Sequence, residues 1–112
     1  MTYTALISAE HLHHHLNDHD WVIVDCRFSL ADTEAGFKAY RHGHIPNACY
    51  AHLDKDLSSR ITDFTGRHPL PNFTELVKKL EAWGIDNNSQ VVVYDDTSGA
   101  IAGRLWWLLR CL

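Results

Sequence analysis

The sequence predicts a single α/β domain built on a mostly parallel sheet flanked by helices. Two apolar runs, at residues 21–24 and 91–94, are continuous rather than alternating, as is typical of parallel strands that are covered on both faces. Segments of helical periodicity lie before, between and after these runs, so helix-like and strand-like stretches alternate along the chain. A chain of 112 residues with 46% hydrophobic residues is long enough for one compact core and too short for two.

The chain begins with a predicted helix and a predicted central strand. Ser8 is a suitable N-cap for a helix that runs to about Leu16, with Leu12 and Leu16 facing the core. The run 21–24 follows as the first buried strand. Its lack of alternation places it in the middle of the sheet.

The next stretch is polar and is predicted to be an irregular loop, with one or two helical turns around residues 35–40. A turn follows, because Pro46 fixes its own φ angle and pushes Ile45 into an extended conformation. This turn is expected to lead into a short strand at residues 49–50.

A surface loop is predicted for residues 58–71, which contain Gly66, Pro69 and Pro71 among polar residues. A helix then begins with Asn72 as its cap and ends at Gly84. Its apolar positions recur at helical spacing: Phe73, Leu76, Val77, Leu80 and Trp83. The second central strand is predicted at residues 91–94.

The last predicted helix starts near Gly103 and is apolar around most of its circumference. Its apolar residues cover more than the stripe that one sheet can bury: Leu105, Trp106, Leu108, Leu109 and Leu112. Trp107 therefore needs a further cover, and we expect the chain to self-associate. The helix also has no capping residue at 110–112, where an α/β domain would continue with another strand. The sequence is thus interpreted as residues 1–112 of an incomplete domain, truncated at its C-terminus.

Composition excludes several classes of partner. The net charge is −4 and the basic residues form no stripe, which argues against a nucleic-acid partner. The chain has neither an apolar run of membrane-spanning length nor an export signal, so a cytoplasmic location without a membrane partner is expected. Its three cysteines, Cys26, Cys49 and Cys111, form no CxxC pair, which favours reduced thiols over disulfides or a thiolate zinc site.

A histidine cluster near the N-terminus is the most conspicuous candidate for metal binding. Its members are His11, His13, His14, His15 and His19, and His11 and His15 have the spacing that lets two side chains share a metal on a helix. No carboxylate or cysteine stands at a convincing third position, so neither a physiological metal nor a cofactor is predicted. Adventitious nickel or zinc binding remains compatible with the cluster. Cys26 and Cys49 are interpreted as packing thiols.

The loop 95–102 joins the second central strand to the last helix and is expected to form an anion-binding cradle. A tight turn at the carboxyl end of a parallel strand points several backbone N–H groups at one spot, and the helix dipole adds positive potential there. Phosphate, a cysteine thiolate or a carboxylate of the chain itself can fill such a spot. Here Asp95 is the first residue after the strand, so the cradle would already hold an anion.

Three motifs together resemble the N-terminal domain of two-domain rhodanese-type sulfurtransferases, of the thiosulfate or 3-mercaptopyruvate kind. The segment 40–48, YRHGHIPNA, is similar to the family's aromatic residue, three spacers and His-Ile-Pro-Gly-Ala, with Asn47 in place of glycine. Asparagine tolerates the left-handed φ that glycine would adopt. The strand 22–27 ends in Asp-x-Arg, and residues 91–96 with 104–110 are similar to the non-catalytic repeat.

The resemblance implies a rhodanese-like fold and a division of labour between two tandem domains. In a catalytic rhodanese domain a cysteine follows the strand directly, takes a sulfane sulfur from a donor, holds it as a persulfide and passes it to a thiophilic acceptor. Asp95 stands at that position here, so the chain itself would have no catalytic residue. The parent protein would be the enzyme, with its cysteine in a C-terminal rhodanese domain that partners this chain.

The resemblance also places the active site at the seam between the two domains, where a small sulfur donor would bind. His44 and Arg104 are the candidate residues that line the seam, and Arg104 suits an oxyanion donor because its guanidinium is planar and permanently charged. Each has a structural alternative: His44 can hydrogen-bond the turn that Pro46 fixes, and Arg104 can be a helix-surface charge. Nothing in the residues distinguishes thiosulfate from 3-mercaptopyruvate as the donor.

Two other functions compete with this interpretation. Phosphoryl-transfer enzymes with an aspartyl nucleophile also place aspartate at a strand end, but they need a second acid two residues later, where this chain has Thr97. A stand-alone rhodanese-like module that binds a partner protein without chemistry is the alternative function. A downstream cysteine-bearing strand, loop and helix would favour the sulfurtransferase, and a single-domain gene would favour the module.

Overall fold

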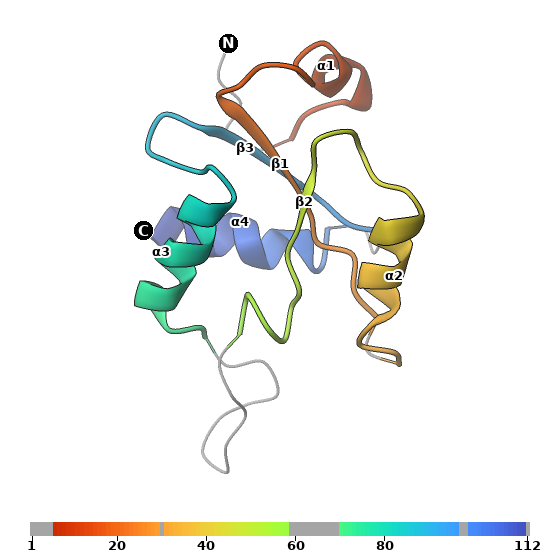
Figure 1. Ribbon diagram of the computed structural model, residues 1–112, viewed down its shortest axis with the longest axis vertical. Helices are drawn as coiled ribbons and strands as arrows, with labels where there is room; N and C mark the ends of the chain where they lie inside the picture. The colour runs from red at the N-terminus through yellow and green to blue at the C-terminus, as the bar shows by residue number, and fades with distance from the viewer. Residues whose placement is uncertain (1–5, 30, 59–69, 97–98, 112) are drawn as a thin grey trace.

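A computed structural model of the chain describes residues 6–29, 31–58, 70–96 and 99–111, and shows an α/β domain (Figure 1). The elements in chain order are α1 (Ala9–His13), β1 (Trp21–Asp25), α2 (Ala35–His42), β2 (Cys49–Tyr50), α3 (Phe73–Ala82), β3 (Gln90–Tyr94) and α4 (Ala102–Cys111). The predicted class and the order of its main elements are confirmed. Most of the predicted loop 58–71 lies outside the residues described here.

The sheet has the order β2-β1-β3, and β1 runs parallel to both neighbours. In the register, Val24 lies opposite Cys49 of β2 and Val93 of β3. The sheet is therefore parallel throughout these strands, as the continuous apolar runs predict. Parallel strands end at the same edge, so the residues that follow β1 and β3 meet there.

Alternate residues of β1 pack into two separate apolar clusters, one on each face of the sheet. On one face Val22 and Val24 pack against the buried leucines of α3 and α4, which are Leu76, Leu80, Leu105 and Leu108. On the other face Ile23 packs with Val92 of β3 and Leu12 of α1. Figure 1 shows α3 and α4 together on one side of the strands and α2 on the opposite side. This double cover explains why β1 has no polar face.

The first helix is shorter than predicted. Ser8 caps it as expected, since the Ser8 hydroxyl accepts a hydrogen bond from the N–H of His11. However, α1 ends at His13 and does not reach Leu16. The N–H groups of His14 and His15 bond to carbonyls three residues back, which tightens the chain into turns beyond His13. Leu12 is buried and Leu16 only partly so.

The helix α3 follows its prediction at both ends. The Asn72 side chain accepts a hydrogen bond from the N–H of Glu75, and Gly84 adopts a φ of 86° just beyond the helix. Positive φ favours glycine, which explains the stop at that position. Two of the apolar residues at helical spacing do not reach the core, because Phe73 and Val77 are each 38% exposed.

The last helix, α4, buries one face and exposes two tryptophans. Leu105 and Leu108 are completely buried, whereas Trp106 is 41% and Trp107 is 47% exposed. The guanidinium of Arg110 lies 5.0 Å from the centre of the Trp106 ring. The exposure of Trp107 agrees with the expectation that this side chain lacks a full cover. Self-association of the chain stays a prediction. None of the helices in the described part of the chain has the length and apolar character that crossing a membrane requires.

Replacing Gly36 of α2 by alanine is expected to destabilise the domain. A Cβ atom at Gly36 would lie 1.8 Å from the carbonyl oxygen of Arg27 and 2.6 Å from the hydroxyl of Tyr50, so backbone would have to move. We expect a loss of about 3 kcal/mol in the free energy of unfolding, measured by urea denaturation. Gly103→Ala in α4 is the matched control, since nothing lies within 4 Å of its Cβ and alanine favours a helix. Equal stability of the two variants would contradict this packing.

Candidate functional site

The carboxylate of Asp95, directly after β3, is surrounded by backbone N–H donors. Its Oδ1 accepts a hydrogen bond from Gly99 (2.8 Å), and its Oδ2 accepts from Ile101 (2.8 Å) and Ala102 (2.7 Å). The donors come from the end of the loop and the first turn of α4, and Gly99 has a φ of 86°. The loop therefore forms the expected cradle of N–H groups, and the chain's own carboxylate fills it.

The described cysteines are poorly suited to act as nucleophiles. Cys26 is fully buried, and its pKa is raised mainly by that burial and further by the charges of Asp25 and Asp95. Burial also raises the pKa of Cys49. Since the thiolate is the reactive form, a raised pKa disfavours both thiols as nucleophiles. The side chain of Cys111 lies outside the described residues.

A buried carboxylate, Asp25, connects the ends of β1 and β3. Asp25 is fully buried, and Arg27 donates to its Oδ2 from Nε (3.0 Å) and Nη2 (2.7 Å). The hydroxyl of Tyr94 donates to the same oxygen (2.9 Å). The hydrogen bond to Asp25 raises the pKa of Arg27, while burial and then the Asp25 hydrogen bond and charge raise the pKa of Tyr94 to about 12. The hydrogen bonds from Arg27 and Tyr94 offset the free-energy cost of removing the Asp25 carboxylate from water.

The turn after α2 is bound to this carboxylate network. Nη2 of Arg27 donates to the carbonyl of Gly43 (2.6 Å), and the N–H of Ile45 donates to the Tyr94 hydroxyl (3.2 Å). Asn47 has a φ of 70°, which is the left-handed conformation. This conformation is expected there, because the motif at residues 40–48 usually has glycine at this position. The ends of β1 and β3 and the turn therefore form one connected region.

His44, one of the two candidate seam residues, lies on this turn and is exposed. Its Nδ1 lies 2.7 Å from the carbonyl oxygen of Tyr40, and its ring stacks on the Tyr40 ring with centroids 3.8 Å apart and planes 13° apart. His44 therefore contacts the end of α2, whereas the structural alternative predicted a hydrogen bond to the turn that Pro46 fixes. Exposure leaves the ring accessible to a partner as well.

Arg104, the other candidate, is anchored to a different segment. It lies in the first turn of α4, and its Nε donates to the carbonyl of the buried Leu57, beyond β2 (2.8 Å). Burial lowers the pKa of Arg104 from its ordinary value. Arg104 is therefore partly buried and joins α4 to the segment after β2, which a simple helix-surface charge would not do. The contacts of His44 and Arg104 hold them to separate parts of the fold.

A buried histidine that the sequence analysis did not single out is His52, which is 5% exposed. Its Nε2 lies 2.9 Å from the carbonyl of Thr33, and its Nδ1 accepts from the N–H groups of Asp54 (3.1 Å) and Lys55 (3.3 Å). These partners place a proton on Nε2, which also lies 3.6 Å from the Glu34 carboxylate, and leave Nδ1 as an acceptor. The only sequence signal was its position just after the predicted strand 49–50, which is too weak to distinguish it from the other histidines.

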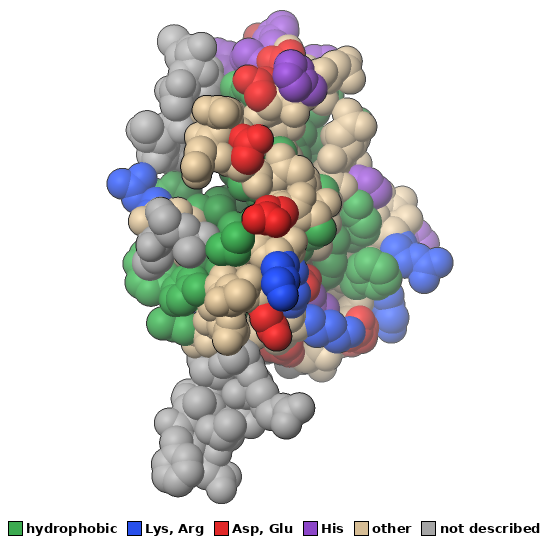
Figure 2. All heavy atoms as spheres, turned by 60° about the vertical axis from the view of Figure 1, so that its left-hand side comes forward, with side chains coloured by type: hydrophobic (Ala, Val, Ile, Leu, Met, Phe, Trp, Pro, Cys, Tyr) green, Lys and Arg blue, Asp and Glu red, His purple; other side chains and the backbone are tan. Residues whose placement is uncertain are grey.

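The N-terminal histidines are exposed or nearly so, and Figure 2 shows histidine side chains gathered at the α1 end of the molecule. His15 is engaged locally: its Nδ1 pairs with Asp18 at 2.6 Å and its ring stacks on Trp21 at 4.0 Å. Across the residues that the structure describes, no three or more His, Cys, Asp or Glu side chains are arranged to hold a metal ion.

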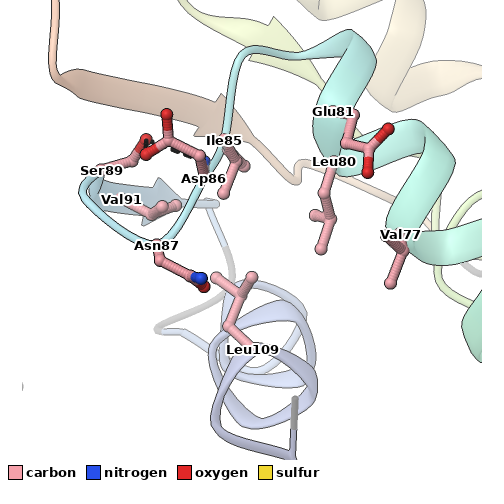
Figure 3. Close-up of a pocket in the computed structure, with 9 residues that line it drawn as sticks. All are labelled: Val77, Leu80, Glu81, Ile85, Asp86, Asn87, Ser89, Val91 and Leu109. Carbon is pink, nitrogen blue, oxygen red and sulfur yellow. Dashed lines mark hydrogen bonds between the residues drawn. The ribbon is translucent and has the colours of Figure 1, made fainter.

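A hollow in the described surface lies away from Asp95. It is a groove of about 540 Å³ between α3, α4 and the start of β3 (Figure 3). Its lining residues are Val77, Leu80, Glu81, Ile85, Asp86, Asn87, Ser89, Val91 and Leu109. This lining contains no cysteine or histidine and lies toward the amino end of β3. The groove therefore offers neither a thiol nor an imidazole, and the carboxyl edge of the sheet remains the candidate site.

Comparison with known proteins identifies the family of this chain. The sequence pattern of the rhodanese-like domain matches residues 8–112. A protein named "Probable 3-mercaptopyruvate sulfurtransferase" from Pseudomonas aeruginosa is 47% identical over 113 residues, which cover all of this chain and 40% of that protein. The mitochondrial thiosulfate/3-mercaptopyruvate sulfurtransferase 1 of Arabidopsis thaliana is 34% identical over 110 residues, covering 97% of this chain and 28% of that protein.

A solved structure gives the same result for the fold. The 3-mercaptopyruvate sulfurtransferase from Leishmania major superposes with a TM-score of 0.86 at 36% identity, over 95% of this chain and 29% of that one. The chain thus spans 40% or less of each of these three relatives. The matched pattern, the relatives and the shared parallel sheet establish that this chain belongs to the rhodanese-like domain family.

Proposed function

We propose that this chain is the non-catalytic, N-terminal part of a two-domain sulfurtransferase. The observation that carries the proposal is the set of three N–H groups that bind the Asp95 carboxylate at 2.7 to 2.8 Å. A cysteine thiolate in such a cradle would be stabilised as an anion and could accept a sulfane sulfur. A carboxylate is equally well stabilised there, but it cannot form a persulfide.

The relatives support the second half of the proposal. They are named as sulfurtransferases of 3-mercaptopyruvate, or of thiosulfate and 3-mercaptopyruvate, and they extend well beyond the length of this chain. The catalytic cysteine would belong to a C-terminal rhodanese domain, and the sulfur donor would bind where that domain meets this one. His44 and Arg104 would contribute from this side. Arg104 fits an oxyanion because its guanidinium is planar and permanently charged.

The proposal predicts that the chain alone does not transfer sulfur. With thiosulfate and cyanide, thiocyanate should not form faster than in the buffer blank, and mass spectrometry should find no added sulfur on the protein. Asp95→Ala should be equally inactive. Turnover above the blank that persists in Asp95→Ala would contradict the proposal, and alkylation mapping would then identify which of Cys26, Cys49 and Cys111 is responsible.

The reading frame after Leu112 separates this proposal from the stand-alone binding module. A second strand, loop and helix with cysteine directly after the strand supports the sulfurtransferase. A gene that ends within one domain supports the module.

A further inference from the structure

The two backbone groups that flank His44 are both held by side chains bound to one carboxylate. The carbonyl of Gly43 accepts from Arg27 Nη2 (2.6 Å), and the N–H of Ile45 donates to the Tyr94 hydroxyl (3.2 Å). Arg27 Nη2 and the Tyr94 hydroxyl both donate to Oδ2 of Asp25, at 2.7 and 2.9 Å. The turn is therefore fixed on both sides of His44 by groups that come from the ends of β1 and β3.

The position of Asp25 makes this connection rigid. Asp25 is the last residue of β1 and is fully buried, so its carboxylate cannot exchange these partners for water without a large cost. The Arg27 guanidinium also lies 5.9 Å from the centre of the Tyr94 ring, which keeps the two donors side by side. We call Asp25, Arg27 and Tyr94 the Asp25 clamp.

The ring of His44 has a defined tautomer in this arrangement. A carbonyl oxygen can only accept, so the 2.7 Å contact between Nδ1 and the carbonyl of Tyr40 requires the proton on Nδ1. In the neutral ring Nε2 is then the acceptor. Because Tyr40 belongs to α2 and His44 to the turn, the contact depends on how the turn is placed against α2.

We propose that Arg27 and Tyr94 are positioning residues, which act through Asp25 to fix the turn at residues 43–45 and the tautomer of His44. His44 thereby presents Nε2 as a hydrogen-bond acceptor at the carboxyl edge of the sheet. The group that meets it across the domain seam is then a donor, such as a hydroxyl, thiol or ammonium. This last step rests on the proposed function, whereas the clamp itself does not.

The test compares two variants of this chain that each lose one hydrogen-bonded hydroxyl. Tyr94→Phe removes the clamp hydroxyl, and Tyr50→Phe removes a hydroxyl that donates at 2.8 Å to the Arg27 carbonyl instead of to the Asp25 carboxylate. Long-range proton–nitrogen NMR spectra report the tautomer of His44, whose signals are assigned by their loss in His44→Gln. Amide exchange reports the Ile45 N–H.

Tyr94→Phe should lower the fraction of His44 with the proton on Nδ1 and speed exchange of the Ile45 amide about tenfold, whereas Tyr50→Phe should change neither. An unchanged tautomer and exchange rate in Tyr94→Phe, or the same change in both variants, would overturn the clamp. If Tyr94→Phe does not fold, Arg27→Lys replaces it, since lysine keeps the charge but loses the fork that reaches both Asp25 and Gly43. No sulfur donor is present in the experiment, so its result is independent of the outcome of the thiocyanate assay.

Discussion

Asp25→Ala is expected to lower the free energy of unfolding by about 3 kcal/mol. The substitution leaves the Arg27 guanidinium and the Tyr94 hydroxyl without their shared acceptor, and it removes a fully buried side chain. A domain of this size should then melt roughly 12 °C lower or more. Urea and thermal denaturation measure both quantities.

Asp96→Ala is the matched control for this substitution. Asp96 is an exposed aspartate that lies near the same edge of the sheet, and its removal should change stability by less than about 0.5 kcal/mol. If Asp25→Ala and Asp96→Ala unfold at the same urea concentration, the buried carboxylate does not hold the strand ends and the turn together.

Asp95→Ala is expected to cost about 3 kcal/mol and to create a site for a small anion. The variant loses three charge-assisted hydrogen bonds and leaves the N–H groups of Gly99, Ile101 and Ala102 without their acceptor. Formate should bind in the vacated cradle, so the melting temperature of the variant should rise with formate concentration more than that of the wild type. Chloride at equal ionic strength separates specific binding from screening.

Asp95→Asn tests the charge with little change of shape. The side-chain amide can still offer one oxygen as an acceptor, but its NH₂ group would face a backbone N–H donor. Asp95→Asn should therefore lose most of the free energy of unfolding that Asp95→Ala loses. A variant that retains wild-type stability would show that the loop does not require an anion.

Local features of the fold could be predicted from the sequence. The apolar runs of β1 and β3 predicted a parallel sheet, and Asn72 and Gly84 predicted both ends of α3. The Asp95 cradle was also predictable, because its donors lie only four to seven residues further along the chain. The end of α1 could not be predicted. The apolar periodicity continues to Leu16, but the chain after His13 forms turns in which the N–H groups of His14 and His15 bond to carbonyls three residues back.

Contacts between distant parts of the chain could not be predicted. Tyr94 and Asp25 are 69 residues apart, and Arg104 and Leu57 are 47 apart, so only the folded sheet brings each pair together. The Asp-x-Arg motif was visible, yet its partners Tyr94 and Gly43 were not. His52 was missed for the same reason, since Thr33 lies 19 residues away from it.

The most direct test of the central claim, that the Asp95 cradle is a nucleophile site occupied by a structural anion, is the thiol pKa of Asp95→Cys. The ultraviolet absorbance of the thiolate is followed with pH, and the wild-type curve is subtracted to remove the native cysteines. With three N–H donors available, the pKa should fall at least about one unit below the ordinary value of about 8.5. Asp96→Cys, at the exposed neighbour, should titrate near that ordinary value. A pKa of Asp95→Cys at or above that of Asp96→Cys would contradict the account.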